Sequence, residues 1–241
     1  MKKLLIFLSL NLLIGNVVAW FMGAAPIEFK PVPYSQQEQA LISELKAELA
    51  ENADDPALQT QLGSLYSLHN QLDDAGQLLT AASASGDDAT ALAWLSGTRA
   101  KQAGAMFDPL MGLRKLYLLR SACSDMDRAV AMDPENFEVR MVRLATYAPT
   151  AVMNCSLETA FTDEAWFKQY FAAQGALAPL ELKLQFNLTM SIAYAKAGGS
   201  DNQQTANNYM AEYQKLSRET EQPPLVLEQL AAANKLLTEG S

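Results

Sequence analysis

Signals that start helices recur along this chain, and no segment alternates between apolar and polar residues as a half-buried strand does. Ser35-Gln36-Gln37-Glu38 has the form of a capping box, and Asp54-Asp55-Pro56 combines an N-cap aspartate with a proline at the first helical position. Similar signals predict helix starts at Asp108-Pro109, Asp133-Pro134 and Thr162-Asp163-Glu164. Because Ala, Leu, Gln, Glu and Met dominate between them, we expect an all-α body of roughly nine or ten helices and no sheet of any size.

The composition excludes several classes of chemistry. The chain has 241 residues, a single histidine (His69) and two cysteines, and it contains no C-x-x-C or H-E-x-x-H spacing. We therefore expect no metal site and no cofactor, and a Ser/His or Cys/His catalytic unit would have to use His69. The net charge of −9 argues against general binding of nucleic acid, which requires cations to neutralise phosphates.

The N-terminus predicts export, and two interpretations of it remain open. Lys2 and Lys3 precede the apolar run of residues 4–14, and Val17-Val18-Ala19 supplies small residues for cleavage after Ala19, as in a bacterial signal peptide. Alternatively, residues 1–25 remain as a membrane anchor, since residues 4–25 carry no charge. Either interpretation places the helical domain, residues 35–241, outside the cytoplasm. It would be soluble in the periplasm or attached to the inner membrane, and a proline-containing linker, residues 26–34, would precede it.

Export changes the interpretation of Cys123 and Cys155. In an oxidising compartment two cysteines often pair, so a disulfide between them is one interpretation. The other is that both are small, buried apolar side chains. Cys123 falls in an expected helix and Cys155 in a loop, and the sequence leaves the choice open.

The residues of one segment, 56–88, carry a resemblance to a known repeat. The positions are Leu62, Gly63, Tyr66, Ala75, Leu79 and Ala82. Their offsets resemble the tetratricopeptide repeat, in which two antiparallel helices pack closely at the small residues and the larger residues fill the space between repeats. His69 falls at the turn between the two helices, so we expect it to be exposed or capping rather than catalytic.

Two weaker matches extend the resemblance. One closes with Ala122, Met126, Ala129 and the segment 131–136, and the other includes residues 192–198 with Ala206 and Met210. The resemblance implies antiparallel helix pairs stacked as an irregular right-handed solenoid, with a final helix at residues 225–237 that could cap it. It also implies binding or assembly rather than catalysis, without naming the ligand.

An arginine-rich segment is the most distinctive feature beyond the repeats. Six of the seven arginines lie between Arg99 and Arg143, and Arg140 and Arg143 share one side of their helix. One hypothesis is that they form an anionic peptide site with Arg114 or Arg120, because guanidinium groups bind carboxylates in a two-pronged manner. The other is that they pair with aspartates and glutamates of the same chain.

These observations predict a non-enzymatic scaffold that holds a protein or peptide in the bacterial cell envelope. A membrane-anchored assembly factor for an envelope complex is the first alternative, and a carboxylate-based cell-wall hydrolase is a weaker one. The expected partner is a protein or peptide and not a nucleic acid, and membrane contact is expected only through an uncleaved N-terminal segment. The identity of the partner and the oligomeric state are left open.

Overall fold

The computed structural model describes residues 2–150, 155–218, 220 and 222–239. This part of the chain is all-α, as predicted: it forms eleven α-helices, ten of them after residue 35, and no strand. Short stretches of π-helix (η1) and 3-10 helix (η2, η3) accompany them. In chain order the elements are α1 (Lys2–Ala19), η1 (Trp20–Ala24), α2 (Gln36–Glu51), α3 (Pro56–Leu68), α4 (Leu72–Ala82), η2 (Ser83–Ser85), α5 (Ala89–Ala105), α6 (Leu113–Met132), α7 (Phe137–Thr150), α8 (Leu157–Gln174), η3 (Gly175–Leu177), α9 (Leu180–Ala197), α10 (Ser200–Leu216) and α11 (Pro224–Glu239).

The first two helices of the body start where the sequence predicts. At α2 the capping box is complete, since the Glu38 backbone N–H donates to Ser35 Oγ at 3.3 Å and the Ser35 N–H donates to Glu38 Oε2 at 2.7 Å. At α3 the Asp55 carboxylate accepts from the backbone N–H groups of residues 57 and 58, directly before Pro56. These caps satisfy donors that have no partner within the helix.

Three predicted helix starts are displaced. Asp108 lies outside α6, but its carboxylate still accepts from the backbone N–H groups of Arg114 and Lys115 at the start of that helix. The residue that caps α7 is Asn136 rather than Asp133. Asp163 starts no helix: it lies inside α8 and is fully buried, because two arginines of α7 bind its carboxylate.

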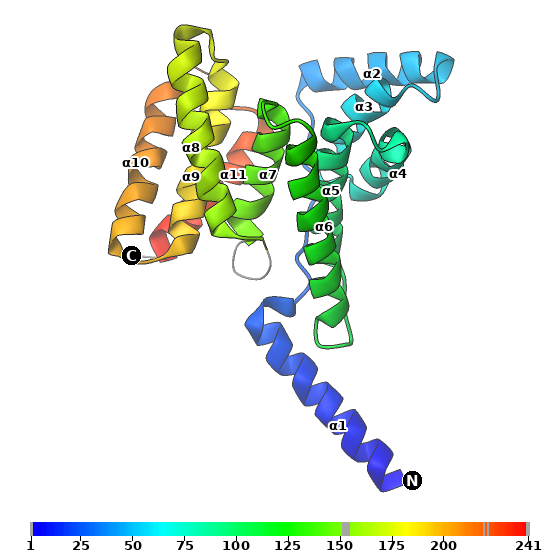
Figure 1. Ribbon diagram of the computed structural model, residues 1–241. Coiled ribbons are helices and arrows are strands. Elements are labelled where there is room, and N and C mark those ends of the chain that lie inside the picture. The colour runs from blue at the N-terminus through cyan, green and yellow to red at the C-terminus, as the bar shows by residue number, and fades with distance from the viewer. Residues whose placement is uncertain (1, 151–154, 219, 221, 240–241) are drawn as a thin grey trace.

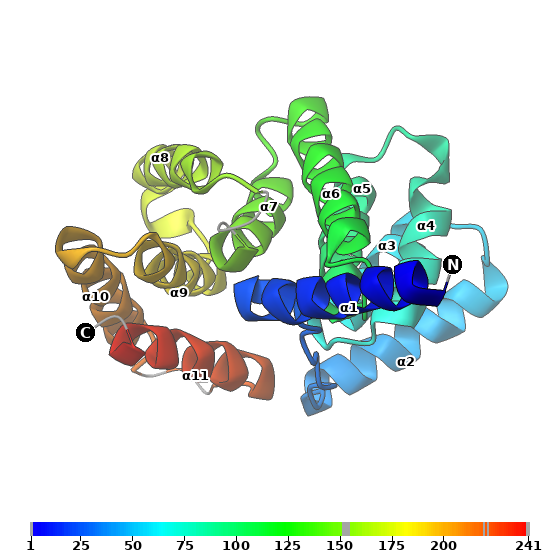
Figure 2. The same ribbon diagram turned by 90° about the horizontal axis from the view of Figure 1, so that it is seen from below.

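The helices follow a regular order of contact. α3 packs against α4 and α5, α5 against α6 and α7, α7 against α8 and α9, and α9 against α10 and α11, while α2 covers α3. Figures 1 and 2 both place α7 between the α5–α6 pair and the α8–α9 pair. Helix α7 therefore joins the two halves of the helical body.

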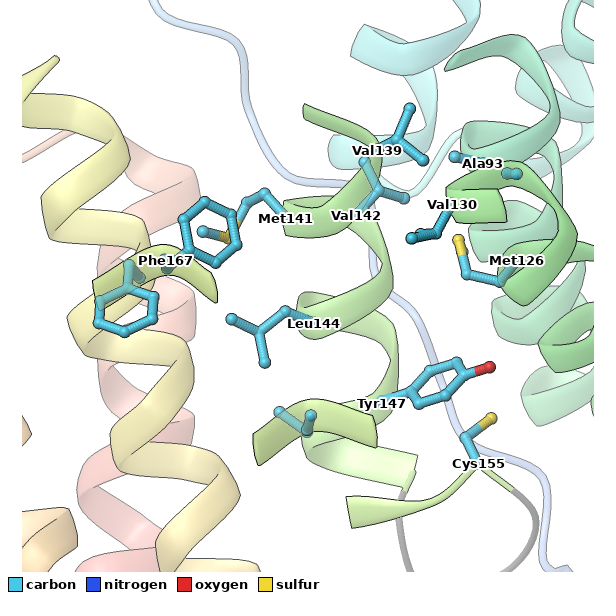
Figure 3. Close-up of a cluster of buried hydrophobic side chains, with 14 of the residues drawn as sticks. Ala93, Met126, Val130, Val139, Met141, Val142, Leu144, Tyr147, Cys155 and Phe167 are labelled. Atoms are coloured by element: carbon cyan, nitrogen blue, oxygen red, sulfur yellow. The ribbon is translucent and has the colours of Figure 1, made fainter. Parts of the chain in front are cut away.

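The largest core cluster is built around α7, which is buried on two opposite sides. Figure 3 shows Val139 and Val142 directed toward the α5–α6 pair, and Met141 and Leu144 directed toward Phe167 of α8. Val139, Leu144 and Phe167 are completely buried. Because apolar area removed from water is the main stabilising contribution, α7 is the helix on which cohesion of the body most depends.

The residues that carry the repeat resemblance lie in the α3–α4 pair and are buried. A Cβ atom placed on Gly63 would lie 2.7 Å from Leu79 Cγ, so the two helices approach each other closely there. Leu62, Tyr66, Ala75 and Leu79 belong to one core cluster, and Ala82 is 1 % exposed.

The N-terminal segment has two parts: a separate helix, α1, and an extended stretch after it that packs along the helical body. Helix α1 projects away from the other helices (Figure 1), whereas residues 25–35 run in an extended path in which Val32 is buried. The backbone N–H of Ile27 donates to the Gly104 carbonyl at 3.0 Å, and that of Val32 donates to the His69 carbonyl at 3.1 Å. Among the described residues, no helix combines the length and apolar character that crossing a membrane requires.

Candidate functional site

The two arginines that the sequence brings to one side of a helix hold a buried carboxylate. Arg140 Nη1 donates to Asp163 Oδ1 at 2.8 Å, while Arg143 donates through Nε to Oδ2 at 2.8 Å and through Nη2 to Oδ1 at 2.7 Å. Asp163 has no exposed surface, and Arg143 is 8 % exposed. The arrangement is the planar guanidinium–carboxylate geometry of the predicted anionic site, with an internal carboxylate in the position of the ligand.

Two further side chains complete the surroundings of this pair. Arg143 Nη1 donates to Asp127 Oδ1 of α6 at 3.2 Å, and the Arg140 guanidinium lies 4.8 Å from the centre of the Trp166 ring. Burial by itself lowers the pKa of Arg143, but hydrogen bonds and attraction from Asp163 and Asp127 outweigh burial and raise that pKa above its usual value. An external anion at this position would have to compete with Asp163.

Arg114 and Arg120, the other two members of the predicted anionic site, are exposed residues of α6. Along α6 they precede Asp127 by thirteen and seven residues, which corresponds to roughly 20 and 10 Å at the rise of an α-helix. The structure therefore brings Arg140 and Arg143 together around Asp163 and sets Arg114 toward the opposite end of α6.

A second buried carboxylate follows directly in the sequence. Glu164 Oε2 accepts from the Tyr194 hydroxyl at 2.8 Å, and its Oε1 accepts from the Tyr209 hydroxyl and, at 2.6 Å, from Lys168 Nζ. Burial, and then the hydrogen bond to Glu164, raise the pKa of Tyr194 to about 12, and the same causes raise the pKa of Tyr209. Because these partners come from α8, α9 and α10, this cluster fastens three helices together.

An open groove of about 560 Å³ lies between α4 and α5. Two stripes with the same spacing, i, i+4 and i+7, line it: the stripe on α4 is polar, and the stripe on α5 joins the apolar Leu95 to Arg99 and Gln102. Gly76 widens the groove, because a Cβ atom there would lie 3.0 Å from Gln102 Nε2. The lining residues are Asp73, Gly76, Gln77 and Thr80 of α4 and Leu95, Arg99 and Gln102 of α5.

The groove was missed by the sequence analysis, although part of the signal was present. Asp73, Gln77 and Thr80 form a polar stripe in the sequence, and Arg99 belongs to the arginine-rich segment. What the sequence could not show is that α4 and α5 set their two stripes opposite each other. Arg99 lies at the margin of this site, with its Nη1 3.6 Å from Asp125 Oδ2 on α6.

His69 has a structural environment that differs from the exposed one expected. It is the C-cap residue of α3, as one of the two predictions had it, but it is completely buried. Its Nδ1 lies 3.1 Å from the Val32 carbonyl and its Nε2 lies 3.1 Å from Glu38 Oε1, while the Tyr34 ring packs on the imidazole with centroids 4.1 Å apart. His69 thus fastens the extended N-terminal segment to α2 and α3.

Cys123 of α6 and Cys155, which lies just before α8, are joined by a disulfide with Cα atoms 5.8 Å apart. The Tyr147 hydroxyl donates to the Cys123 carbonyl at 2.9 Å, so the bond lies beside the central helix α7. Within the described ranges, no group of three or more His, Cys, Asp or Glu side chains is placed to hold a metal ion.

Comparison of the chain with protein-family models, with curated proteins and with solved structures finds no match. Its function must therefore be argued from its own surfaces.

Proposed function

We propose that this protein is a non-enzymatic scaffold of the bacterial cell envelope that holds a protein or peptide segment in the groove between α4 and α5. The observation that carries the proposal is this open groove, lined by Asp73, Gln77 and Thr80 of α4 and by Leu95, Arg99 and Gln102 of α5. Its cation, Arg99, faces Asp125 at 3.6 Å, but the arginine side chain is 46 % exposed and so accessible to a ligand.

The order of helix contacts supports a repeat-type scaffold. Alternate helices α3, α5, α7 and α9 contact one another in turn, and each also packs against the helix that follows it. Stacked helix pairs of the kind implied by the resemblance are expected to pack in this order, and such arrays present extended binding surfaces. The irregular right-handed solenoid remains part of the proposal.

The chemistry of the groove suits an extended polypeptide. The amide of Gln77 and the hydroxyl of Thr80 can each donate to or accept from a peptide backbone. The Gln102 Nε2 donates to the Leu72 carbonyl at 2.9 Å, and the amide oxygen of Gln102 can accept from a peptide N–H. Arg99 supplies a cation for a carboxylate of the ligand, and Leu95 supplies an apolar contact. Since this mixture contains few buried apolar positions, a moderate affinity that depends on Arg99 is expected.

The location in the envelope is supported by the N-terminal sequence and by the disulfide. A positively charged start followed by an apolar run is typical of export, and a cysteine pair joined across 32 residues is typical of an oxidising compartment. Whether the mature chain begins after Ala19 or keeps its first residues as an anchor distinguishes a periplasmic scaffold from a membrane-anchored assembly factor.

The hydrolase alternative is not favoured. Such an enzyme needs two carboxyl groups that face a common substrate pocket. The three buried carboxylates of the described residues are occupied instead: Asp163 and Glu164 are bound by side chains of neighbouring helices, and Asp108 accepts from backbone N–H groups.

Site-specific photocrosslinking in cells tests the proposal. A photoreactive amino acid is placed in the full chain at Gln77 or Thr80, both exposed residues of the groove, or at Gln169, an exposed residue of α8 that serves as the control. We expect the two groove positions to crosslink to the same envelope protein and Gln169 not to do so. Arg99→Glu should reduce that crosslink about tenfold, since an arginine anchor contributes upward of about 1.4 kcal/mol. Equal crosslinking from Gln169, or none from the groove, would refute the proposal.

A further inference from the structure

The loop that joins α5 and α6 exposes an unusual number of apolar side chains at one end of the body. Within this segment, which we name the α5–α6 tip (residues 106–113), Phe107, Leu110, Met111 and Leu113 are exposed, with Phe107 at 62 %. Tyr117, one helical turn beyond Leu113, is 72 % exposed. A cluster of exposed large apolar residues on a protein surface marks a contact with something else.

The backbone of the tip is held in an uncommon conformation at its end. Met111 has φ of 57° and Gly112 has φ of 78°, so two successive residues adopt the left-handed conformation. This conformation is uncommon for a residue with a side chain, and it persists only where the surroundings impose it. Here the Met111 N–H donates to Asn16 Oδ1 at 3.0 Å.

The tip is continuous with a second apolar surface, that of α1 and η1. Asn16 Nδ2 donates to the Pro109 carbonyl at 2.7 Å, and the rings of Trp20 and Phe107 meet edge to face with centroids 6.0 Å apart. In Figure 1 the C-terminal end of α1 lies beside the loop between α5 and α6, and the rest of α1 points away from the body. Most of the apolar side chains described on α1 and η1 are exposed, and Phe21 reaches 90 %.

The charges of the tip taken together with the first two turns of α6 also differ from those of the rest of the molecule. Residues 105–120 contain three cations and one carboxylate, in a chain whose net charge is −9. That carboxylate, Asp108, is 2 % exposed and is turned inward, where it accepts from three backbone N–H groups. Arg114 is exposed beside Leu113, whereas Lys115 is buried with its Nζ 2.7 Å from the Ala25 carbonyl.

We propose that, in the chain that keeps its first residues, the α5–α6 tip and the adjoining surface of α1 and η1 form a membrane-contacting surface that enters the interfacial region of a bilayer containing anionic phospholipid. The exposed apolar residues would enter the acyl-chain boundary, Trp20 and Tyr117 would lie at the level of the headgroups, and Arg114 would face lipid phosphates. The inward carboxylate of Asp108 removes the one acidic group that anionic lipid would repel. This surface is separate from the groove between α4 and α5, so the body would be oriented on the membrane whatever the groove binds.

An environment-sensitive fluorophore on the tip tests the proposal. Phe107→Cys is introduced into the full chain and labelled with a nitrobenzoxadiazole dye, since both native cysteines are in the disulfide. Leu177→Cys is the matched control: Leu177 is an apolar residue exposed to 85 %, and it belongs to the turn between α8 and α9, which lies at the opposite end of the body (Figure 1). Both proteins are reconstituted into vesicles of phosphatidylcholine with phosphatidylglycerol, or of phosphatidylcholine alone.

We expect the dye at residue 107 to shift to the blue, to gain several-fold in emission and to be quenched by lipids labelled in the acyl chain, more strongly with phosphatidylglycerol present. The dye at residue 177 should stay accessible to aqueous iodide. Equal behaviour of the two positions would overturn the proposal, as would an equal response to vesicles without anionic lipid. A shift that depends on protein concentration rather than on lipid would overturn it too, because a second copy of the chain would then cover the tip. A dye at residue 117, introduced by Tyr117→Cys, provides an independent position with the same expected outcome.

Discussion

Replacing Asp163 by alanine removes the carboxylate that two arginines of α7 share, and it leaves those arginines in a place where water hardly reaches them. Three N–H donors bind Asp163, two from Arg143 and one from Arg140, at 2.7–2.8 Å. Breaking a buried ion pair by removing one partner typically costs about 3–5 kcal/mol of unfolding free energy. Because Asp127 still faces Arg143, we expect Asp163→Ala to fall near the lower end of this range.

The assay is urea unfolding of the disulfide-intact protein, followed by circular dichroism, with thermal unfolding alongside. A loss of about 3 kcal/mol corresponds to a melting temperature lower by roughly 6–12 °C for a chain of this size. Asp163→Asn keeps the shape of the side chain and removes its charge, so it separates loss of the charge from creation of a cavity. We expect Asp163→Asn to lose most of the stability that Asp163→Ala loses, since its amide N–H₂ donors would face the N–H donors of the guanidinium groups.

Asp125→Ala is the matched control. Asp125 also faces two arginines, Arg99 at 3.6 Å and Arg128 at 3.2 Å, but the arginine side chains there are 46 % and 63 % exposed. Exposed pairs contribute less than about 1 kcal/mol. If Asp163→Ala and Asp125→Ala lost equal stability, the reasoning that burial decides the strength of these pairs would be refuted.

Two further predictions concern the packing of the helices. Gly63→Ala should lower the unfolding free energy by about 1–3 kcal/mol, because the new Cβ would meet Leu79. Gly76→Ala is the control: its new Cβ meets only the end of a flexible glutamine, so the unfolding free energy should change by less than about 1 kcal/mol. Urea unfolding compares the two variants, and equal effects would contradict the close approach of α3 and α4. Reduction of the Cys123–Cys155 disulfide, which closes a loop with a sequence separation of 32, should lower the unfolding free energy by about 2–4 kcal/mol. Thermal unfolding with and without a thiol reductant measures this loss of stability. If mass spectrometry of the alkylated, non-reduced protein found two free thiols, the disulfide itself would be refuted.

The parts of the fold that local sequence determines could be predicted. The capping box at Ser35 and Glu38 depends on residues three apart, so its sequence pattern and its geometry coincide. The all-α class follows in the same way from composition and from the lack of alternation. Gly63 and Leu79 show the limit of such reasoning, since their contact was inferred from a repeat pattern and not from any local rule.

The candidate sites depend on contacts between helices, and for this reason the sequence predicted them only in part. Thr162-Asp163-Glu164 resembles a helix start, yet Asp163 lies inside α8, where Arg140 and Arg143, 23 and 20 residues earlier in the chain, bind its buried carboxylate. The spacing of the two arginines correctly indicated a shared helix side. Which carboxylate would meet that side depends on how α7 and α8 pack, and no local pattern encodes this.

The way in which residues 24–32 are tied to the body has a mechanical consequence. Lys115 Nζ donates to the carbonyls of Ala24 and Ala25, and the backbones of Ile27 and Val32 are hydrogen-bonded to Gly104 and His69. A pulling force on α1 would load these bonds together, as in shear, rather than open them one after another from an end. Tension at the N-terminus would therefore be transmitted into the α5–α6 pair instead of extending a flexible linker. The helical body would then follow the movements and the tilt of whatever holds α1.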